Sequence, residues 1–220
     1  MKKNKRGLII CGTDTDVGKT VISSLLVQGL NAIYWKPIQS GIESGTDTDR
    51  VRQLLNLSQE RWIPEVYKFK TPVSPHWAAE IDNETVNPNL LQIPNINKPL
   101  IIETAGGLMV PLNRQFLQID QLKNWGLEVL LVARSGLGTL NHTLLSIEAL
   151  RKRDIKIIGL ILNGTLHKDN PKTLEEFGGI PVIAQLPILE KLNSITLAEE
   201  WEKQNLTLWF NQYTSNKTST

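Results

Sequence analysis

Short runs of apolar and β-branched residues alternate along the chain with longer amphipathic segments. An apolar run of about four to eight residues is typical of a buried strand, and apolar positions three or four apart indicate a helix. Strands that alternate with helices predict an α/β fold with a doubly wound, mostly parallel sheet. The predicted strands are residues 7–11, 32–35, 99–103, 127–133, 155–162 and 179–187. The predicted helices are residues 18–30, 48–56, 119–125, 141–153 and 197–204.

Residues 58–97 interrupt this alternation and are rich in proline and asparagine. We interpret them as an excursion from the sheet rather than as a second domain. A chain of 220 residues most simply makes one domain with a substantial core. We therefore expect a single domain over residues 1–220, with the polar residues from about 211 to 220 forming a flexible tail.

The charge balance argues against two classes of partner. The formal net charge is only +2, so we expect neither nucleic acid nor a membrane surface to bind the protein electrostatically. No apolar run approaches the length of a membrane span. The apolar run at residues 8–11 is too short for a signal peptide. The single cysteine, Cys11, cannot form an internal disulfide, which favours a cytoplasmic location.

The segment between the first predicted strand and the first predicted helix reads CGTDTDVGKT (residues 11–20). A phosphate-binding loop has four residues between its glycines, but here five residues separate Gly12 from Gly18. A strand–loop–helix turn still directs backbone N–H groups and the helix N-terminus at one point, as a phosphate requires. We expect Lys19 to reach the β- and γ-phosphates and Thr20 to ligate Mg²⁺. The alternative, a chance helix start with a surface lysine, fits this context less well.

Three further charged residues lie where predicted elements begin or end. Glu103 ends an apolar strand, where a carboxylate is costly unless it is paired or bound to a metal. Asp49 lies at a predicted helix start and is either a Mg²⁺ ligand or a carboxylate that stabilises the helix end; taken alone, the second reading is favoured. Lys36 ends the second strand and is either solvated or, with Lys19, stabilises an anion being phosphorylated, with Ser40 as a nearby donor.

Five segments occur in the order and approximate spacing found in dethiobiotin synthetases: GTDTDVGKT, KPIQSG, TPVSPHWAA, ETAGGLMVPL and GLGTLNHTLLS. The chain resembles this family from residue 8 to about residue 187, and the displaced glycine with its Thr-Asp-Thr run is close to diagnostic. The resemblance implies a P-loop NTPase-like fold and a homodimer with the substrate site at its interface. It also implies a dethiobiotin synthase, which uses ATP and Mg²⁺ to close a ureido ring on 7,8-diaminononanoate with CO₂.

The resemblance implies roles for individual residues. The catalytic residues would be Lys36, Lys19 and Thr15. The metal ligands would be Thr20, Asp49 and Glu103, with Asp47 as the other possible alignment for Asp49. The nucleotide-binding residues would be Asp16, Val17, Gly18, Lys19, Thr20, Val21, Asp49, Glu103, Thr104, Ala105, Gly106, Asn163, Gly164, Pro187, Ile188 and Leu189. The substrate-binding residues would be Ser40 and, from the partner subunit, Gly138, Thr139, Leu140 and Asn141.

The implied reaction passes through a carbamate. A substrate amine adds CO₂, the carbamate oxygen attacks the γ-phosphate, and the second amine displaces phosphate from the carbamic-phosphoric anhydride. Two positions depart from the family pattern. Asp16 stands where many members have glutamate, and Thr104 replaces a glycine and adds a Cβ near the phosphates.

Two other functions fit a phosphate loop on this fold. The first is a nucleotide-switched ATPase of the partitioning or septum-positioning type, which usually carries a lysine early in the loop; residues 12–14 offer none. The second is another amide-forming ligase, several of which need a glutaminase domain for which the chain has no room. Guanine-binding switch proteins would carry an Asn-Lys-x-Asp run, and its absence from the sequence leaves ATP or another triphosphate as the phosphate donor.

Overall fold

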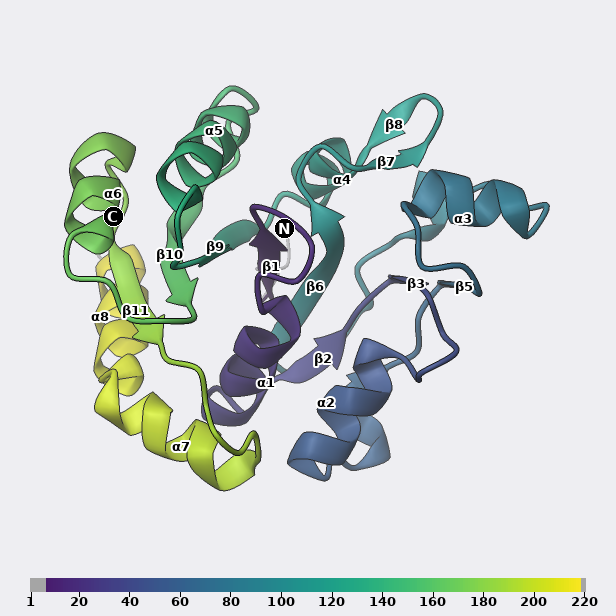
Figure 1. Ribbon diagram of the computed structural model, residues 1–220. Helices are drawn as coiled ribbons and strands as arrows, with labels where there is room; N and C mark the ends of the chain where they lie inside the picture. The colour runs from purple at the N-terminus through teal and green to yellow at the C-terminus, as the bar shows by residue number, and fades with distance from the viewer. Residues whose placement is uncertain (1–6, 219–220) are drawn as a thin grey trace.

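A seven-stranded parallel sheet forms the centre of the molecule (Figure 1). The computed structural model describes residues 7–218. The strands of this sheet are β1 (Gly7–Gly12), β2 (Ile33–Trp35), β4 (Trp62–Ile63), β6 (Leu100–Gly107), β9 (Glu128–Arg134), β10 (Ile157–Asn163) and β11 (Val182–Leu186). They lie in the order β11-β10-β9-β1-β6-β2-β4, and all neighbours run parallel.

Helices cover both faces of this sheet (Figure 1). They are α1 (Lys19–Gly29), α2 (Asp47–Leu55), α3 (Pro75–Ile81), α4 (Gln118–Trp125), α5 (Thr139–Arg151), α6 (Asn170–Gly178), α7 (Ser194–Lys203) and α8 (Leu206–Thr218). Apolar residues of α1, α2, α7 and α8 pack on one face, and those of α3, α4, α5 and α6 pack on the other. The predicted doubly wound α/β fold is confirmed. Within residues 7–218, no helix is both long and apolar enough to cross a membrane.

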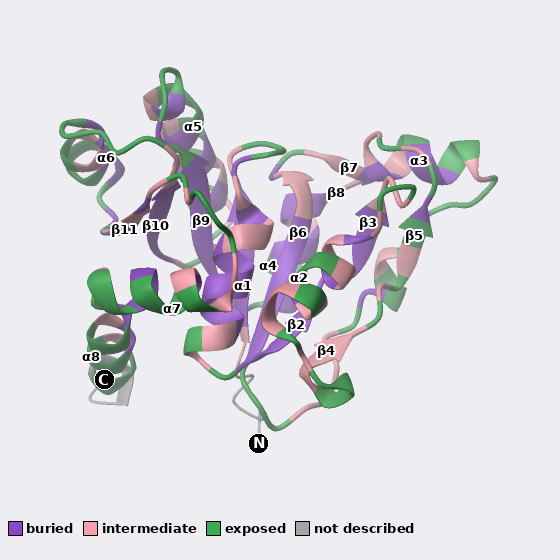
Figure 2. Cartoon of the chain, turned by 60° about the horizontal axis from the view of Figure 1, so that its bottom comes forward, coloured by how far each residue is buried: buried purple, intermediate pink, exposed green. Residues whose placement is uncertain are grey.

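The central strands are apolar on both faces because helices cover both. Successive side chains of a strand point to opposite faces. In β1, Ile9 and Cys11 therefore join the cluster under α4 and α5, whereas Leu8 and Ile10 join the cluster under α1 and α7. Figure 2 shows these buried strands between helices whose outer surfaces are exposed. This double burial explains why unbroken apolar runs, rather than alternating ones, mark the strands in the sequence.

Residues 58–97 differ from the prediction, because they add a strand to the sheet. The two-residue strand β4 pairs with β2 and forms one edge. The guanidinium of Arg52 lies 4.0 Å from the ring centroid of Trp62 in this strand, a cation–π contact on the edge. The remaining short strands are β3 (Ile38–Ser40), which pairs with β5 (Tyr67–Phe69), and β7 (Pro111–Asn113), which pairs with β8 (Phe116–Leu117).

The predicted C-terminal tail is corrected over residues 211–218, which belong to helix α8. The Tyr213 hydroxyl donates to Glu128 Oε1 at 2.7 Å, and its ring stacks on Trp209 with centroids 5.3 Å apart. Phe210 is buried in the cluster under α7. These aromatic contacts attach a segment that looks polar in the sequence. Residues 219–220 of the predicted tail lie outside the described residues.

The carboxyl ends of three parallel strands meet beside the start of α1. The phosphate-loop segment follows β1, Lys36 follows β2, and β6 carries Glu103 and extends to Gly107, four residues beyond its predicted end. Ligands of open α/β sheets bind at this edge of the sheet. The topology therefore brings the charged residues singled out in the sequence to one place.

Candidate functional site

The loop between β1 and α1 folds back over the start of the helix. The Lys19 ammonium donates to the Asp14 carbonyl oxygen at 2.8 Å, and Thr15 N–H donates to Asp14 Oδ1 at 2.7 Å. Asp16 adopts a left-handed conformation with φ of 55°. The extra residue of the loop is thus accommodated by a turn that Asp14 stabilises with both its backbone and its side chain.

Both loop glycines lie so close to neighbouring atoms that a side chain would not fit at either position. Gly18 has φ of 96°, and a Cβ there would lie 2.1 Å from Nδ2 of Asn163. That amide nitrogen donates to Val17 O at 3.1 Å, so Asn163 at the end of β10 contacts the loop directly. A Cβ on Gly12 would lie 2.8 Å from a methyl group of Val17 and 2.9 Å from Asp14 O. The shifted glycine spacing is therefore part of how this loop packs.

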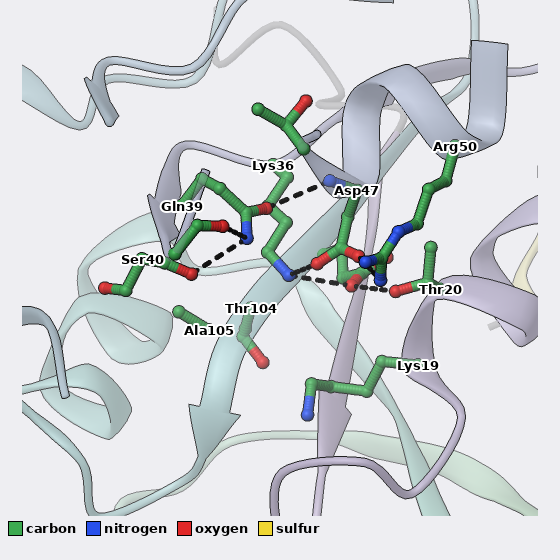
Figure 3. A network of polar contacts seen from close by, with 12 residues as sticks. Lys19, Thr20, Lys36, Gln39, Ser40, Asp47, Arg50, Thr104 and Ala105 are labelled. Atoms are coloured by element: carbon green, nitrogen blue, oxygen red, sulfur yellow. Dashed lines mark hydrogen bonds and ion pairs between the residues drawn. The ribbon is translucent and has the colours of Figure 1, made fainter. Parts of the chain in front are cut away.

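A charge network of buried and partly buried residues lies next to the loop (Figure 3). The Lys36 ammonium is 3.1 Å from Glu103 Oε1 and pairs with Oδ2 of Asp47. The Thr20 hydroxyl donates to Glu103 Oε1 at 2.8 Å, and the Tyr34 hydroxyl donates to Glu103 Oε2 at 2.9 Å. The Glu103 carboxylate is completely buried, so these donors replace the water it loses.

Mutual attraction keeps the buried Lys36 and the partly buried Asp47 charged. Burial alone would lower the pKa of Lys36, but Glu103 and Asp47 outweigh it, and the pKa is raised above its usual value. Burial would likewise raise the pKa of Asp47, but Lys36 outweighs it, and the pKa is lowered. For Lys19, burial dominates and lowers the pKa, with Glu103 opposing this effect. The cleft therefore holds two buried lysines beside two carboxylates.

The structure does not bring Asp49 into this network, and the placement of Asp49 among the metal-side residues needs correction. Asp49 Oδ2 accepts hydrogen bonds from Thr46 N and Thr46 Oγ1 at 3.2 and 3.0 Å, and Oδ1 pairs with Arg52 at 3.3 Å. This is a capping box, the helix-stabilising reading that the sequence left open for Asp49. The alternative residue Asp47 faces the cleft instead.

The network borders a cleft of about 820 Å³. Predicted site residues that line it are Thr15, Asp16, Gly18, Lys19, Thr20, Val21, Lys36, Ser40, Glu103, Ala105 and Gly106. Asp47 lines it as well, with residues that the sequence did not single out, among them Gln39, Gly41, Arg50, Lys70 and Ser74. The cleft thus joins the phosphate loop, the end of β2 and the start of α3.

The other predicted residues lie around this cleft rather than in its wall. The side chain of Val17, a residue of the loop, is buried. Asn163, at the end of β10, donates a hydrogen bond to the backbone of Val17. Gly164 follows β10, and its N–H donates to Leu186 O at 2.9 Å, which ties it to β11 and so to residues 187–189. Gly138 caps α5, whose first residues are Thr139, Leu140 and Asn141, on the far side of β9.

Comparison with known proteins identifies the family. The sequence profile of the AAA domain family matches residues 6–196. An ATP-dependent dethiobiotin synthetase of Brucella anthropi is 46% identical over 198 residues, which cover 90% of this chain and 93% of that protein. One of Rhizorhabdus wittichii is 47% identical over 193 residues, which cover 88% and 92%. The chain belongs to the dethiobiotin synthetase family. The family and enzyme class predicted from the motifs are confirmed.

Solved structures resemble this dethiobiotin synthetase family member in fold. A putative plasmid partition protein of Borrelia burgdorferi superposes with a TM-score of 0.59 at 13% identity, over 96% of this chain and all of that one. A ParA family ATPase of Chlorobium tepidum superposes with a TM-score of 0.54 at 15% identity, over 89% and 90%. Because the sequence identity is so low, these superpositions show the shared fold alone. They confirm the predicted P-loop NTPase-like architecture.

Both departures from the dethiobiotin synthetase pattern are accommodated. The Thr104 side chain is 2% exposed and its hydroxyl donates to Ile10 O at 3.3 Å, so it faces β1 rather than the cleft. Asp16 is exposed at the rim of the cleft.

The sequence analysis missed one glutamine, Gln118 of α4. Its side chain accepts a hydrogen bond from Ala105 N at 3.0 Å and donates one to Gly107 O at 2.8 Å. It thereby fixes the small residues that end β6.

The oxygen atoms in the cleft suit Mg²⁺. Thr20, Asp47 and Glu103 offer one hydroxyl and two carboxylates, the hard donors that Mg²⁺ prefers. Within residues 7–218, no group of three or more His, Cys, Asp or Glu side chains could hold a metal by itself. Mg²⁺ commonly completes its shell with substrate phosphates and waters, so this small donor set fits a metal that arrives with a nucleotide.

Replacing Lys36 tests the buried network. Lys36→Met removes the ammonium that lies between the completely buried Glu103 and the partly buried Asp47. Asp47 keeps its pair with the exposed Arg50 at 3.2 Å, and we expect a loss of about 3 kcal/mol of unfolding free energy at pH 8. In the wild type the pKa of Asp47 is lowered, so its contribution is fully present above pH 4 and does not change between pH 5 and pH 8. Removing Lys36 takes away the largest effect that lowers the pKa of Asp47, so that pKa rises relative to the wild type and the variant's deficit grows as pH rises. Urea denaturation at the two pH values measures the difference.

The expected deficit of Lys36→Met is therefore smaller at pH 5 than at pH 8. Lys172→Met, which removes an exposed partner of Glu176 on α6, serves as the control and should change stability by less than about 0.5 kcal/mol at either pH. A Lys36→Met deficit of equal size at both pH values would contradict the assigned ion pair.

Proposed function

We propose that this protein uses ATP and Mg²⁺ to carboxylate 7,8-diaminononanoate with CO₂ and to close it to dethiobiotin. The observation that carries the proposal is the meeting of the phosphate loop with the buried Lys36 and Glu103 and the partly buried Asp47 in one cleft, in a chain of the dethiobiotin synthetase family. The volume of about 820 Å³ suits a nucleoside triphosphate tail and a small diamine together.

The triphosphate binds at the start of α1. The backbone of residues 16–21 and the helix N-terminus supply N–H donors and a positive dipole, and Lys19 exchanges the Asp14 carbonyl for phosphate oxygens. Thr20, Asp47 and Glu103 would hold Mg²⁺, which would neutralise negative charge on the triphosphate. Ala105 and Gly106 let the phosphates approach the backbone of β6.

Ring closure needs charge neutralisation more than proton abstraction. An amine of the diamine adds CO₂ and releases one proton to give an anionic carbamate. The carbamate oxygen forms a bond to the γ-phosphorus as the bond to ADP breaks. The second amine then forms the last C–N bond as the C–O bond of the carbamic-phosphoric anhydride breaks. Phosphate leaves, and the amine releases its proton to solvent. We assign the stabilisation of the anions of these steps to Lys36 and Lys19, which line the cleft together with Thr15.

Ser40 serves the diamine side of the cleft. Its hydroxyl oxygen is buried and has no hydrogen-bond partner among the described residues, and it lines the cleft beyond Lys36. A buried polar atom without a partner is costly, so a ligand that supplies one is favoured. We assign this hydroxyl to the diamine or its carbamate. Asn163, Gly164 and residues 187–189 are proposed to flank the base, next to the loop they contact.

A homodimer completes the substrate site in this proposal. Leu137, which precedes the cap of α5, is fully exposed, and Leu145 of α5 and Phe177 of α6 are more than half exposed. Apolar residues gathered on neighbouring elements favour a protein interface. Gly138–Asn141 then reach the carboxylate tail of the diamine bound by the partner subunit, through the N-terminus of α5. The proposal takes residues 1–220 as one domain and keeps the cytoplasmic location inferred from the single, buried Cys11.

The second candidate is a nucleotide-switched partitioning ATPase, favoured only by the shared fold. Such proteins usually carry a lysine early in the loop, where this chain has Asp14. Here Asp14 pairs with Arg134 at 3.1 Å, and its negative charge would repel a partner's phosphates. The ligase is therefore the better supported function.

The reaction itself provides the first test. Purified protein is mixed with ATP, Mg²⁺, bicarbonate and 7,8-diaminononanoate, and phosphate release is measured together with dethiobiotin by mass spectrometry. We expect one phosphate for each ring formed and little release without the diamine. Phosphate release that is independent of the diamine, with no ring product, would favour the partitioning-type ATPase instead.

Two aspartates of α2 provide a matched pair of variants. Asp47→Asn is expected to raise the Mg²⁺ concentration for half-maximal activity by at least about tenfold, because a metal-side carboxylate is lost. Asp49→Asn weakens the capping box and the exposed pair with Arg52, costs about 1 kcal/mol of stability and leaves the Mg²⁺ dependence unchanged. A shift in the Asp49 variant but not in the Asp47 variant would restore the original assignment.

Mixed dimers test the shared site. Lys36→Met disables the cleft of its own subunit, and Asn141→Asp places a negative charge near the carboxylate tail in the partner's cleft. If residues 138–141 act across the interface, mixing the two inactive proteins restores about a quarter of wild-type activity, through one intact site in half of the dimers. Activity that stays at the level of the separate variants would show that residues 138–141 do not complete the partner's site.

A further inference from the structure

Gln39 is a buried polar residue of the cleft wall to which neither the family motifs nor the proposed reaction gives a task. Its side chain is 8% exposed. Its Oε1 accepts a hydrogen bond from Asp47 N at 3.1 Å (Figure 3). Its Nε2 donates to Ser40 O at 3.1 Å and to Gly41 O at 3.5 Å. Both ends of the amide are therefore bonded to backbone on different segments.

These two segments carry the two halves of the proposed site. Asp47 is the first residue of α2, and its carboxylate pairs with Lys36. Ser40 ends β3, and its unpartnered hydroxyl lies in the cleft wall. The chain between them includes Glu43 and Ser44, which are exposed. Gln39 bridges this loop at its base, so the positions of Asp47 and Ser40 do not depend on the exposed loop alone.

We propose that Gln39 is a positioning residue that holds Asp47 and Ser40 at a fixed separation on either side of Lys36. The inference rests on the proposed function, because it takes Asp47 as a metal-side residue and Ser40 as a diamine-side residue. A buried amide bonded at both ends resists displacement, since movement of either segment leaves a polar group unpaired. A displacement of about 1 Å between reacting groups can cost a hundredfold in rate, so this separation matters for in-line transfer.

Gln39→Met is the main variant, because methionine keeps the length of glutamine and removes both hydrogen bonds. Gln39→Asn is the second variant; it keeps an amide in the same surroundings but is one methylene too short to bridge both segments. Gln204→Met is the matched control. Gln204 accepts from Gln185 N at 3.3 Å and donates to Gln185 O at 2.9 Å, between the end of α7 and β11. It makes the same kind of backbone bridge and does not line the cleft.

Calorimetric titration with ADP over a series of Mg²⁺ concentrations is the first measurement, and kcat and KM for the diamine are the second. We expect both Gln39 variants to raise the Mg²⁺ concentration for half-maximal ADP affinity by about tenfold. KM for the diamine should rise severalfold in the same variants. ADP affinity without Mg²⁺ should stay unchanged, because the phosphate loop is untouched. Gln204→Met is expected to lower the melting temperature only.

Three outcomes would overturn the inference. Gln39 variants that lose melting temperature with unchanged Mg²⁺ dependence and KM would show a structural role only. Equal shifts in Gln204→Met would show general loosening of the fold. A fall in Mg²⁺-free ADP affinity would show that Gln39 supports the phosphate loop instead. Asp47→Asn in the same titration separates this from the proposed function: if it shifts the Mg²⁺ dependence and the Gln39 variants do not, only the positioning role fails.

Discussion

The ammonium of Lys36 lies between the completely buried carboxylate of Glu103 and the partly buried carboxylate of Asp47, and the edge of the sheet depends on that arrangement. Each buried charge is tolerable only because the others are present. Glu103 extends from β6, Lys36 follows β2, and Asp47 begins α2, so the ion pairs join three elements that the sequence separates. The Thr20 and Tyr34 hydroxyls bring in α1 and the interior of β2. The groups proposed to handle phosphate are thus also the groups that hold this edge together.

Most of the central fold was predictable because a strand that is buried on both faces appears in the sequence as an unbroken apolar run. Strands such as β1 and β9 are apolar at every buried interior position, which for β9 means residues 129–133, and the sequence shows these runs. The elements that were missed lack such a pattern. Strand β4 has two residues, helix α6 buries little apolar surface besides Leu174, and α8 hides its aromatic contacts within a polar segment. Their stability comes from tertiary contacts that no local periodicity reports.

The candidate site was predictable where a residue follows a strong strand and ambiguous elsewhere. Lys36 and Glu103 could be located because strand ends meet at one edge of a parallel sheet. Asp47 and Asp49 are two residues apart, so on a helix they point about 200° apart and only one can face the cleft. Choosing between them requires the helix start, which Thr46 fixes through the capping box. The contacts of Gln39 and Gln118 depend on loop paths, for which the sequence carries no simple signal.

Because Gly18 and Asn163 are in contact, a substitution at one of these positions constrains which residue the other can be. The left-handed backbone at residue 18 favours glycine, and the amide of residue 163 fills the space where a side chain would start. A larger residue at either position would disturb the other, and with it both the phosphate loop and the proposed base site. Attempts to alter nucleotide preference would therefore meet fewer conflicts at residues 187–189, where Ile188 is exposed, than at Asn163. The close approach of Gly18 to Asn163 therefore limits which positions can be changed in such a redesign.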